Sequence, residues 1–350
     1  MTNRAPIQKN LCDSAMTESA GSSWWRIPTT GAAGVMLLGF GGLLPAYLAS
    51  DFTLKVANEG LLLGMLALSV AFLMSEAGLV ALGVASVYGG AGYLFAIGMS
   101  EWGLTPTIAV VFAFFALIAY SGVLGALIVR TNPLAFMMLT LAAGEMVSHA
   151  VMLEAVHDYT GGADGLVVNF KGAILGMQAA DFVNPRYFWP IGWTAVWLIS
   201  VTLWGVARSR LGATLRAVRQ NEERMRFSGF NTYLPRVIAY VLVNAVAAVA
   251  GLLHVLNTGF VSPESLGLGV STNALVAALM GGTAGSIGPL VGGLIFAFAQ
   301  DEFGARGATQ LLTGVAIVLF IVVFPRGVVG GVVAVLRRIA PGLVWLRGKA

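Results

Sequence analysis

The sequence has a single cysteine, Cys12, and three histidines, His149, His157 and His254. One cysteine can form neither an intramolecular disulfide nor a thiolate metal site. The histidines are too scattered for the tight ligand spacing of a zinc site. No paired-carboxylate, Ser-His-Asp or Cys-His arrangement stands out either. We therefore expect no metal site and no catalytic residues.

Charged residues are also scarce. They make up 10% of the 350 residues, whereas 57% are hydrophobic, and the mean hydropathy is +0.84. A soluble domain carries roughly 25% charged residues. Windows of about 20 apolar residues are the signature of membrane helices, and the 45 glycines allow such helices to approach closely. The sequence predicts an all-α polytopic membrane protein in contact with lipid. The net charge of +4 then indicates cytoplasmic arginines and not nucleic-acid binding.

Apolar windows predict spans near residues 31–50, 58–74, 77–98, 106–129, 134–157, 188–207, 236–257 and 308–336. Residues 270–300 hold two shorter apolar pieces around a glycine-rich break, which predicts a pair of short helices or a re-entrant hairpin. Counting this pair as two passes gives about ten passes in total. Non-helical backbone at membrane depth persists only where protein or a water-filled cavity covers it, so the break is a candidate lining of a path.

Arginine placement predicts the orientation. The connection at 208–236 and the C-terminal end are both rich in arginine and should be cytoplasmic. Residues 1–30 then form a cytoplasmic tail, 31–336 a transmembrane domain and 337–350 a second cytoplasmic tail. The acidic connection at 158–187 falls outside and is the natural docking place for an external partner. Both termini are expected on the inside of a cell inner membrane.

The segment SRLGATLRAVRQNEERMRFSGF, residues 209–230, is the most charged part of the domain, and we refer to it as the basic segment. Its apolar residues recur at helical spacing, at Leu211, Leu215, Val218 and Met225. This predicts one short amphipathic helix that begins after Ser209 and ends at Ser228-Gly229. Such a helix either rests on anionic headgroups or inserts its apolar face into a groove of a cytoplasmic partner. Periodicity does not separate these two interpretations.

The basic segment and the helix after it resemble the LivM-type permeases, membrane subunits of branched-chain amino acid ABC importers. The matching residues are Gly212, Leu215-Arg216-Ala217-Val218-Arg219, Asn221-Glu222, Gly229 and Arg236. Four further stretches follow the family's order: AGLVALGVASVYGGAGYLFA, NPLAFMMLTLAAGEMV, YTGGADGL and VSPESLGLGVSTNALVAALMGGTAGSIGPLVGG. The likeness covers roughly residues 55–325. It departs from the family at Val80–Val84, where the usual Ser-Leu-Gly-His is missing.

The resemblance implies an ATP-driven importer with ABC ATPase subunits, a second permease subunit from a different chain and a periplasmic substrate-binding protein. The chain has four lysines, none in a phosphate-binding Gly-x-x-x-x-Gly-Lys-Ser/Thr loop, so ATP should be bound by the partners and no cofactor by this chain. The basic segment then becomes the expected ATPase-coupling helix, and docking is favoured over headgroup binding. The residues carried over to it are Leu215, Arg216, Val218, Arg219, Asn221, Glu222 and Gly229.

Candidates for the translocation path are Thr140, Glu145, Gly281, Gly282, Gly285 and Gly288. Glu145 lies in a predicted span with His149 one turn later, and ionisable residues in spans are functional candidates. The structural alternative, which we favour for this pair, is an internally satisfied hydrogen bond between helices. The glycines fit close helix packing and path lining equally well.

Three functions stay open at this point. The first is a permease for branched-chain amino acids. The second is the same machine with urea or a short amide as cargo, because such permeases share these motifs. The third is an ion-coupled secondary transporter that would use Glu145 as the coupling carboxylate.

Overall fold

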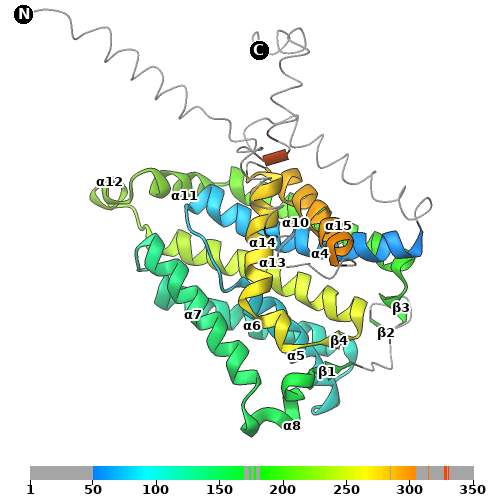
Figure 1. Cartoon of the computed structure of the whole chain (residues 1–350). Helices are drawn as coiled ribbons and strands as arrows, with labels where there is room; N and C mark the ends of the chain where they lie inside the picture. Colours follow the sequence, from blue (N-terminus) through cyan, green and yellow to red (C-terminus); the bar gives the residue numbers. More distant parts are fainter. Residues whose placement is uncertain are drawn as a thin grey trace, which may run out of the picture.

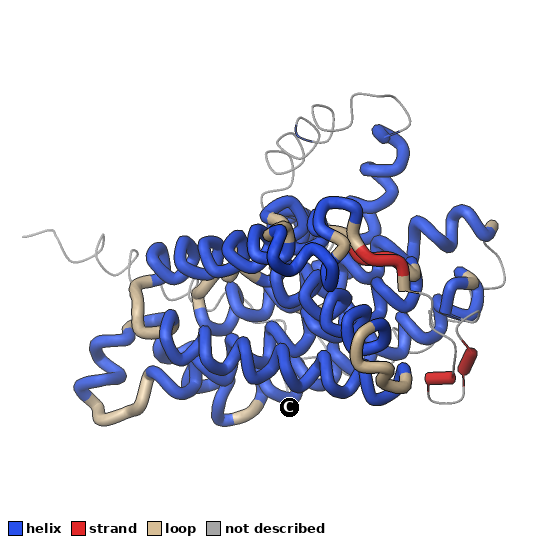
Figure 2. Tube along the Cα trace, turned by 90° about the horizontal axis from the view of Figure 1, so that it is seen from below, coloured by secondary structure: helices blue, strands red, loops and turns tan. Residues whose placement is uncertain are grey.

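A computed structural model describes residues 50–168, 173–174, 177–178, 182–283 and 285–304, together with residues 314, 327, 328 and 330. This part of the chain is a helical bundle with a few two-residue strands (Figures 1 and 2). Five of its helices are long and apolar enough to cross a membrane, which supports an integral membrane protein. The spans predicted at 31–50 and 308–336, and both predicted tails, lie outside the described residues.

Helix α4, Asp51–Phe72, is the most buried of the five and continues as a π-helical turn, η2, Leu73–Ala77. It begins at Ser50, whose hydroxyl accepts a hydrogen bond from the Thr53 backbone N–H. Its buried residues are mostly apolar, with Asn58 and Ser69 as exceptions, as expected for a helix in the middle of a bundle. It packs against α10, Pro185–Arg208, α13, Tyr233–Thr258, α14, Leu268–Gly281, and α15, Ile287–Gly304.

Helix α5, Val84–Ser100, is shorter than the span predicted at 77–98. Gly78 adopts a left-handed conformation (φ 69°) that ends η2, and the chain runs without helical structure to Gly83. Side chains from distant helices satisfy this irregular backbone: Thr140 accepts a hydrogen bond from the Leu82 N–H, and Ser271 accepts one from the Ala85 N–H. Apolar windows do not register such a break.

Helices α6, Pro106–Ile128, and α7, Pro133–Val151, each begin with a proline at the first helical position. The prediction that the fifth span extends to residue 157 is wrong, because α7 ends at Val151. The chain then forms the short helical turns η3, Glu154–Val156, α8, His157–Thr160, and η4, Gly162–Asp164. The Thr160 hydroxyl donates to the Val151 carbonyl at 2.7 Å and so folds this connection back onto the end of α7.

Two small antiparallel pairings lie in the connections. Strand β1, Leu166–Val167, pairs with β4, Phe260–Val261, and β2, Ala173–Ile174, pairs with β3, Met177–Gln178. The first pairing fastens the connection after α8 to the end of α13, which η5, Pro263–Leu266, then follows. Both are too short to show as alternating patterns in the sequence.

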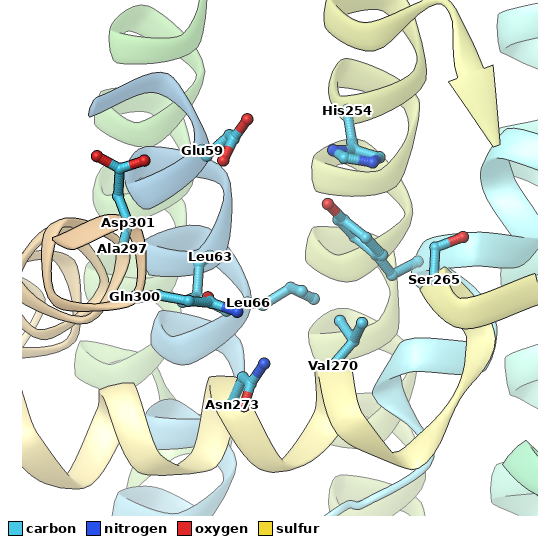
Figure 3. A pocket seen from close by; sticks show the side chains of 11 residues that line it. Glu59, Leu63, Leu66, His254, Ser265, Val270, Asn273, Ala297, Gln300 and Asp301 are labelled. Carbon is cyan, nitrogen blue, oxygen red and sulfur yellow. The ribbon is translucent and has the colours of Figure 1, made fainter. Parts of the chain in front are cut away.

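The prediction of two short helices within 270–300 is confirmed by α14 and α15. They are separated by residues 282–286, where Gly282 and Gly285 have positive φ angles of 97° and 137°. Helix α14 crosses over α4 and α13 instead of running alongside them (Figures 1 and 3). Helix α15 returns along α4.

Candidate functional site

The basic segment forms two helices where the sequence predicts one. Helix α11, Arg210–Gln220, ends at Asn221, which is extended, and α12, Glu222–Phe227, begins directly after it. The Asn221 side-chain oxygen accepts a hydrogen bond from the Arg224 N–H at 2.9 Å. Asparagine is a strong N-cap, so this residue starts a new helix at the cost of ending the old one. The predicted end is confirmed: Ser228 caps α12, and Gly229 is left-handed.

The apolar face of α11 packs against this chain's own bundle. Leu215 and Val218 are 0% and 2% exposed, and α11 packs against α10, η2 and α13. The expectation that this face inserts into a groove of a partner is therefore wrong, because the chain itself already covers it. Hydrophobic periodicity shows that a face is buried but not by which molecule.

Two arginines of α11 attach the helix to η2. The Arg216 guanidinium donates to the Glu76 carboxylate at 2.5 Å and to the Ala207 carbonyl at 2.8 Å. The Glu76 side chain is 2% exposed and that of Arg216 27%. Arg219 donates to the Ser75 carbonyl, and its aliphatic stem lies against Gly78. The sequence singled out both arginines, but their partners at residues 75–78 were not expected.

Helix α12 is attached to α13 by a second ion pair. Arg236 donates to the Glu222 carboxylate at 2.9 Å, and Thr232 also donates to that carboxylate, at 3.4 Å. A cavity of about 590 Å³ lies beside this pair. It is lined by Val129, Arg130, Glu222, Arg226, Gly229, Phe230, Asn231, Thr232, Tyr233 and Arg236.

Two aromatic side chains close to this cavity face outward. Phe227 is 91% exposed and Phe230 57% exposed. Arg226 precedes Phe227 in the sequence and lines the same cavity as Phe230. The free apolar surface of the basic segment therefore lies at its C-terminal end. Sequence periodicity did not single out either phenylalanine, because neither belongs to the stripe of α11.

The path candidates on α7 make hydrogen bonds within the chain. Thr140 is 1% exposed and bonds to the irregular backbone at Leu82, as described above. Glu145 accepts a hydrogen bond from the Leu268 N–H at 3.1 Å, at the first residue of α14. His149 lies 3.9 Å from the Glu145 carboxylate, with its side chain 77% exposed. These contacts agree with the structural interpretation of Glu145, and its role in transport stays a prediction.

The glycine candidates mark the closest approach of α14 to α15. A Cβ atom added to Gly281 would lie 1.8 Å from the Gly288 carbonyl oxygen, and one added to Gly288 would lie 2.3 Å from the Gly282 carbonyl oxygen. Gly282 and Gly285 supply the positive φ angles of the break. Close packing thus accounts for Gly281 and Gly288, and the backbone conformation of the break accounts for Gly282 and Gly285. Path lining by these glycines stays a prediction.

A second cavity, of about 630 Å³, lies between α4, α13, α14 and α15, and we call it the Glu59 cavity (Figure 3). It is lined by Glu59, Leu63, Leu66, Tyr88, His254, Ser265, Val270, Asn273, Ala297, Gln300 and Asp301. None of the predicted path residues lines it. The sequence does contain one indication of this cavity, because Glu59 is a carboxylate inside an apolar window. No group of three or more potential metal ligands occurs in the described part of the chain.

The sequence matches a known family over most of its length. Residues 52–324 match the family described as "Branched-chain amino acid transport system / permease component". The expected relationship is therefore confirmed at the level of the family. No solved structure matches the chain.

Individual relatives match over shorter stretches. The high-affinity branched-chain amino acid transport system permease protein LivH of Escherichia coli (strain K12) is 28% identical over 165 residues, which are 46% of this chain and 50% of that protein. The autoinducer 2 import system permease protein LsrC of Yersinia pseudotuberculosis serotype O:1b (strain IP 31758) is 30% identical over 115 residues, 32% of each chain. The chain thus spans half the length of the first relative and about a third of the second.

Proposed function

The chain belongs to the family of branched-chain amino acid transport system permease components, and from this we propose that it is the membrane-spanning permease subunit of an ATP-driven ABC importer. In this proposal separate ATPase subunits hydrolyse ATP. A second permease subunit, a different chain, completes the path, and a periplasmic protein delivers the cargo. The importer lies in the cell inner membrane, with the basic segment in the cytoplasm, and this chain is not itself an enzyme.

The main structural support for the proposal is the attachment of α11 to η2. A partner that moves the basic segment also moves Glu76, because Arg216 and Glu76 form a largely buried ion pair. Glu76 continues the axis of α4, and Glu59 lies on the same helix about 25 Å away, at 1.5 Å per residue. Helices transmit such displacements as rigid bodies. The arrangement therefore supports transmission of an ATPase movement from the basic segment to the Glu59 cavity.

The ATPase contact is proposed at Phe227 and Phe230. Exposed aromatic side chains bordered by arginines are typical anchors of a protein interface. The buried stripe of α11 then holds the segment on its own chain, while the end of α12 engages the partner. The residues first expected to form the coupling helix hold the basic segment in place but do not form its exposed apolar patch. They are Leu215, Arg216, Val218, Arg219, Asn221, Glu222 and Gly229.

The proposed cargo is a branched-chain amino acid. The family description and the name of LivH support it. The name of LsrC shows that related permeases serve another cargo, so urea or a short amide is kept as the alternative. Ion-coupled transport has less support, because Glu145 already accepts a hydrogen bond from Leu268.

Affinity purification of the tagged full-length chain from its native membranes tests the proposal. We expect an ABC ATPase to copurify, and the Phe227→Ala/Phe230→Ala variant to lose at least about tenfold of it, because hot-spot aromatic residues contribute 2 kcal/mol or more each. Phe115→Ala is the matched control, since Phe115 is 62% exposed on α6, far along the chain from the basic segment. Absence of any ATPase, together with uptake driven by an ion gradient, would overturn the proposal.

A further inference from the structure

Two carboxylates border the Glu59 cavity from neighbouring helices. Glu59 lies on α4 and Asp301 on α15, and both reach the cavity in Figure 3. Each interacts electrostatically with the other, and neither forms a hydrogen bond or ion pair with any residue that the structure describes. No lysine or arginine lines the cavity. Lys55, one turn before Glu59 on α4, also interacts electrostatically with Glu59 but does not line the cavity.

An aromatic wall faces these carboxylates. Tyr88 is 7% exposed and lines the cavity, yet its hydroxyl has no hydrogen-bond partner among the described residues. Its ring lies 5.3 Å from that of His254, at an interplanar angle of 36°. This hydroxyl is not among the fully buried polar atoms without a partner, so it is open to the cavity. A ligand or water in the cavity can therefore form a hydrogen bond with it.

The floor of the cavity differs from its acidic rim. The floor has apolar surface from Leu63, Leu66, Val270 and Ala297. It also has two side-chain amides, from Asn273 and Gln300. The amides can donate hydrogen bonds to a carboxylate without adding charge. The lining thus offers a place for an ammonium group, an apolar group of a few carbons and a hydrogen-bond acceptor.

We propose that the Glu59 cavity binds the primary ammonium group of its cargo between the carboxylates of Glu59 and Asp301. Carboxylates form strong charge-assisted hydrogen bonds with ammonium. The apolar floor takes the aliphatic side chain of the cargo. This inference rests on the proposed transport function and narrows its cargo to primary amines and α-amino acids. An uncharged cargo such as urea can donate hydrogen bonds to these carboxylates but has no positive charge to pair with them.

Direct binding to the purified full-length chain tests the site. The probe is tritiated 3-methylbutylamine, which has the ammonium and aliphatic groups of leucine but lacks its carboxylate, and binding is followed by scintillation proximity. We expect unlabelled L-leucine to displace the probe. 4-Methylpentanoate, which lacks the ammonium, and urea should not displace it at the same concentration.

Three variants and one control locate the site. Glu59→Gln and Asp301→Asn should each weaken probe binding about tenfold, the effect of losing one charge-assisted hydrogen bond. Tyr88→Phe should weaken it less, because it removes a neutral hydroxyl and no charge. Glu101→Gln, which removes an exposed carboxylate at the end of α5 and outside the cavity, should bind like the parent chain. Thermal unfolding shows that each variant is folded.

Each outcome decides one proposal. Unchanged binding in Glu59→Gln and Asp301→Asn, displacement of the probe by urea, or no binding by the parent chain would each overturn the ammonium site. Copurification of the ATPase is measured on the same preparations. An ATPase without probe binding overturns the site and leaves the permease function standing. Probe binding without any ATPase supports the site and counts against the ATP-driven importer.

Discussion

Arg216 of α11 and Glu76 of η2 form an ion pair of 2.5 Å between residues 140 positions apart in the sequence. It joins the basic segment to the end of the most buried helix of the bundle. A buried carboxylate is tolerated only when it is paired and hydrogen-bonded. This contact therefore fixes where the basic segment lies on the bundle.

Replacing only one member of this pair should destabilise the chain. Arg216→Met leaves the Glu76 carboxylate buried without its partner, and we expect the free energy of unfolding to fall by about 3 kcal/mol. The double variant Arg216→Met/Glu76→Gln removes both charges and should recover part of this loss. Thermal unfolding in detergent measures both. Equal stability of the single variant and the parent chain would show that the pair contributes nothing.

Replacing Glu222 and replacing Arg236, the two members of the second ion pair, should have different effects on stability. Glu222→Gln leaves Arg236, whose side chain is 7% exposed, without a carboxylate, and should cost about 3 kcal/mol. Arg236→Met leaves Glu222, which is 37% exposed and can be solvated, and should cost about 1 kcal/mol. Hydrogen exchange over residues 222–227 should rise in both variants, because α12 loses its attachment to α13. The reverse order of stabilities would contradict this assignment.

A methyl group should not fit between α14 and α15. Gly281→Ala places Cβ against the Gly288 carbonyl, and we expect a loss of about 3 kcal/mol. Gly122 in α6 has nothing within 4 Å of the corresponding position. Gly122→Ala should leave stability unchanged or raise it by about 0.5 kcal/mol, since alanine is the better helix former. Unfolding temperatures of the two variants give the comparison.

Variants of Glu145 distinguish a structural role of this residue from a role in ion coupling. Glu145→Ala removes the acceptor of the Leu268 N–H, and we expect a loss of about 1 kcal/mol with uptake retained in membrane vesicles. Glu145→Gln keeps an acceptor oxygen and should lose less. His149→Ala should change nothing measurable, because that side chain is mostly exposed. Loss of uptake in Glu145→Gln at unchanged stability would favour an ion-coupled transporter.

Much of the fold follows from composition and hydrophobic length. The windows at 58–74, 106–129, 188–207 and 236–257 each correspond to a helix of the structure. The windows at 77–98 and 134–157 were less accurate. Hydropathy does not show where the backbone stops forming helical hydrogen bonds. The breaks at residues 79–83 and 152–157 depend on contacts with Thr140, Ser271 and Thr160.

The candidate sites were less predictable than the helices. Charge bias and periodicity singled out the basic segment and even its residues Arg216 and Arg219. They did not show that α11 faces inward or that Phe227 and Phe230 remain exposed. The Glu59 cavity was missed, because its lining comes from α4, α5, α13, η5, α14 and α15, and no local pattern joins these elements.

The sequence by itself determined the membrane class, the family and the position of the basic segment. These depend on residue composition, span length and local motifs, which are one-dimensional properties. Only the tertiary structure decided the partner of Arg216, the inward face of α11 and the lining of the Glu59 cavity. The physical reason is that buried charges and cavities depend on atoms brought together from distant segments. A single carboxylate such as Glu59 becomes part of a cavity only when other helices pack around it.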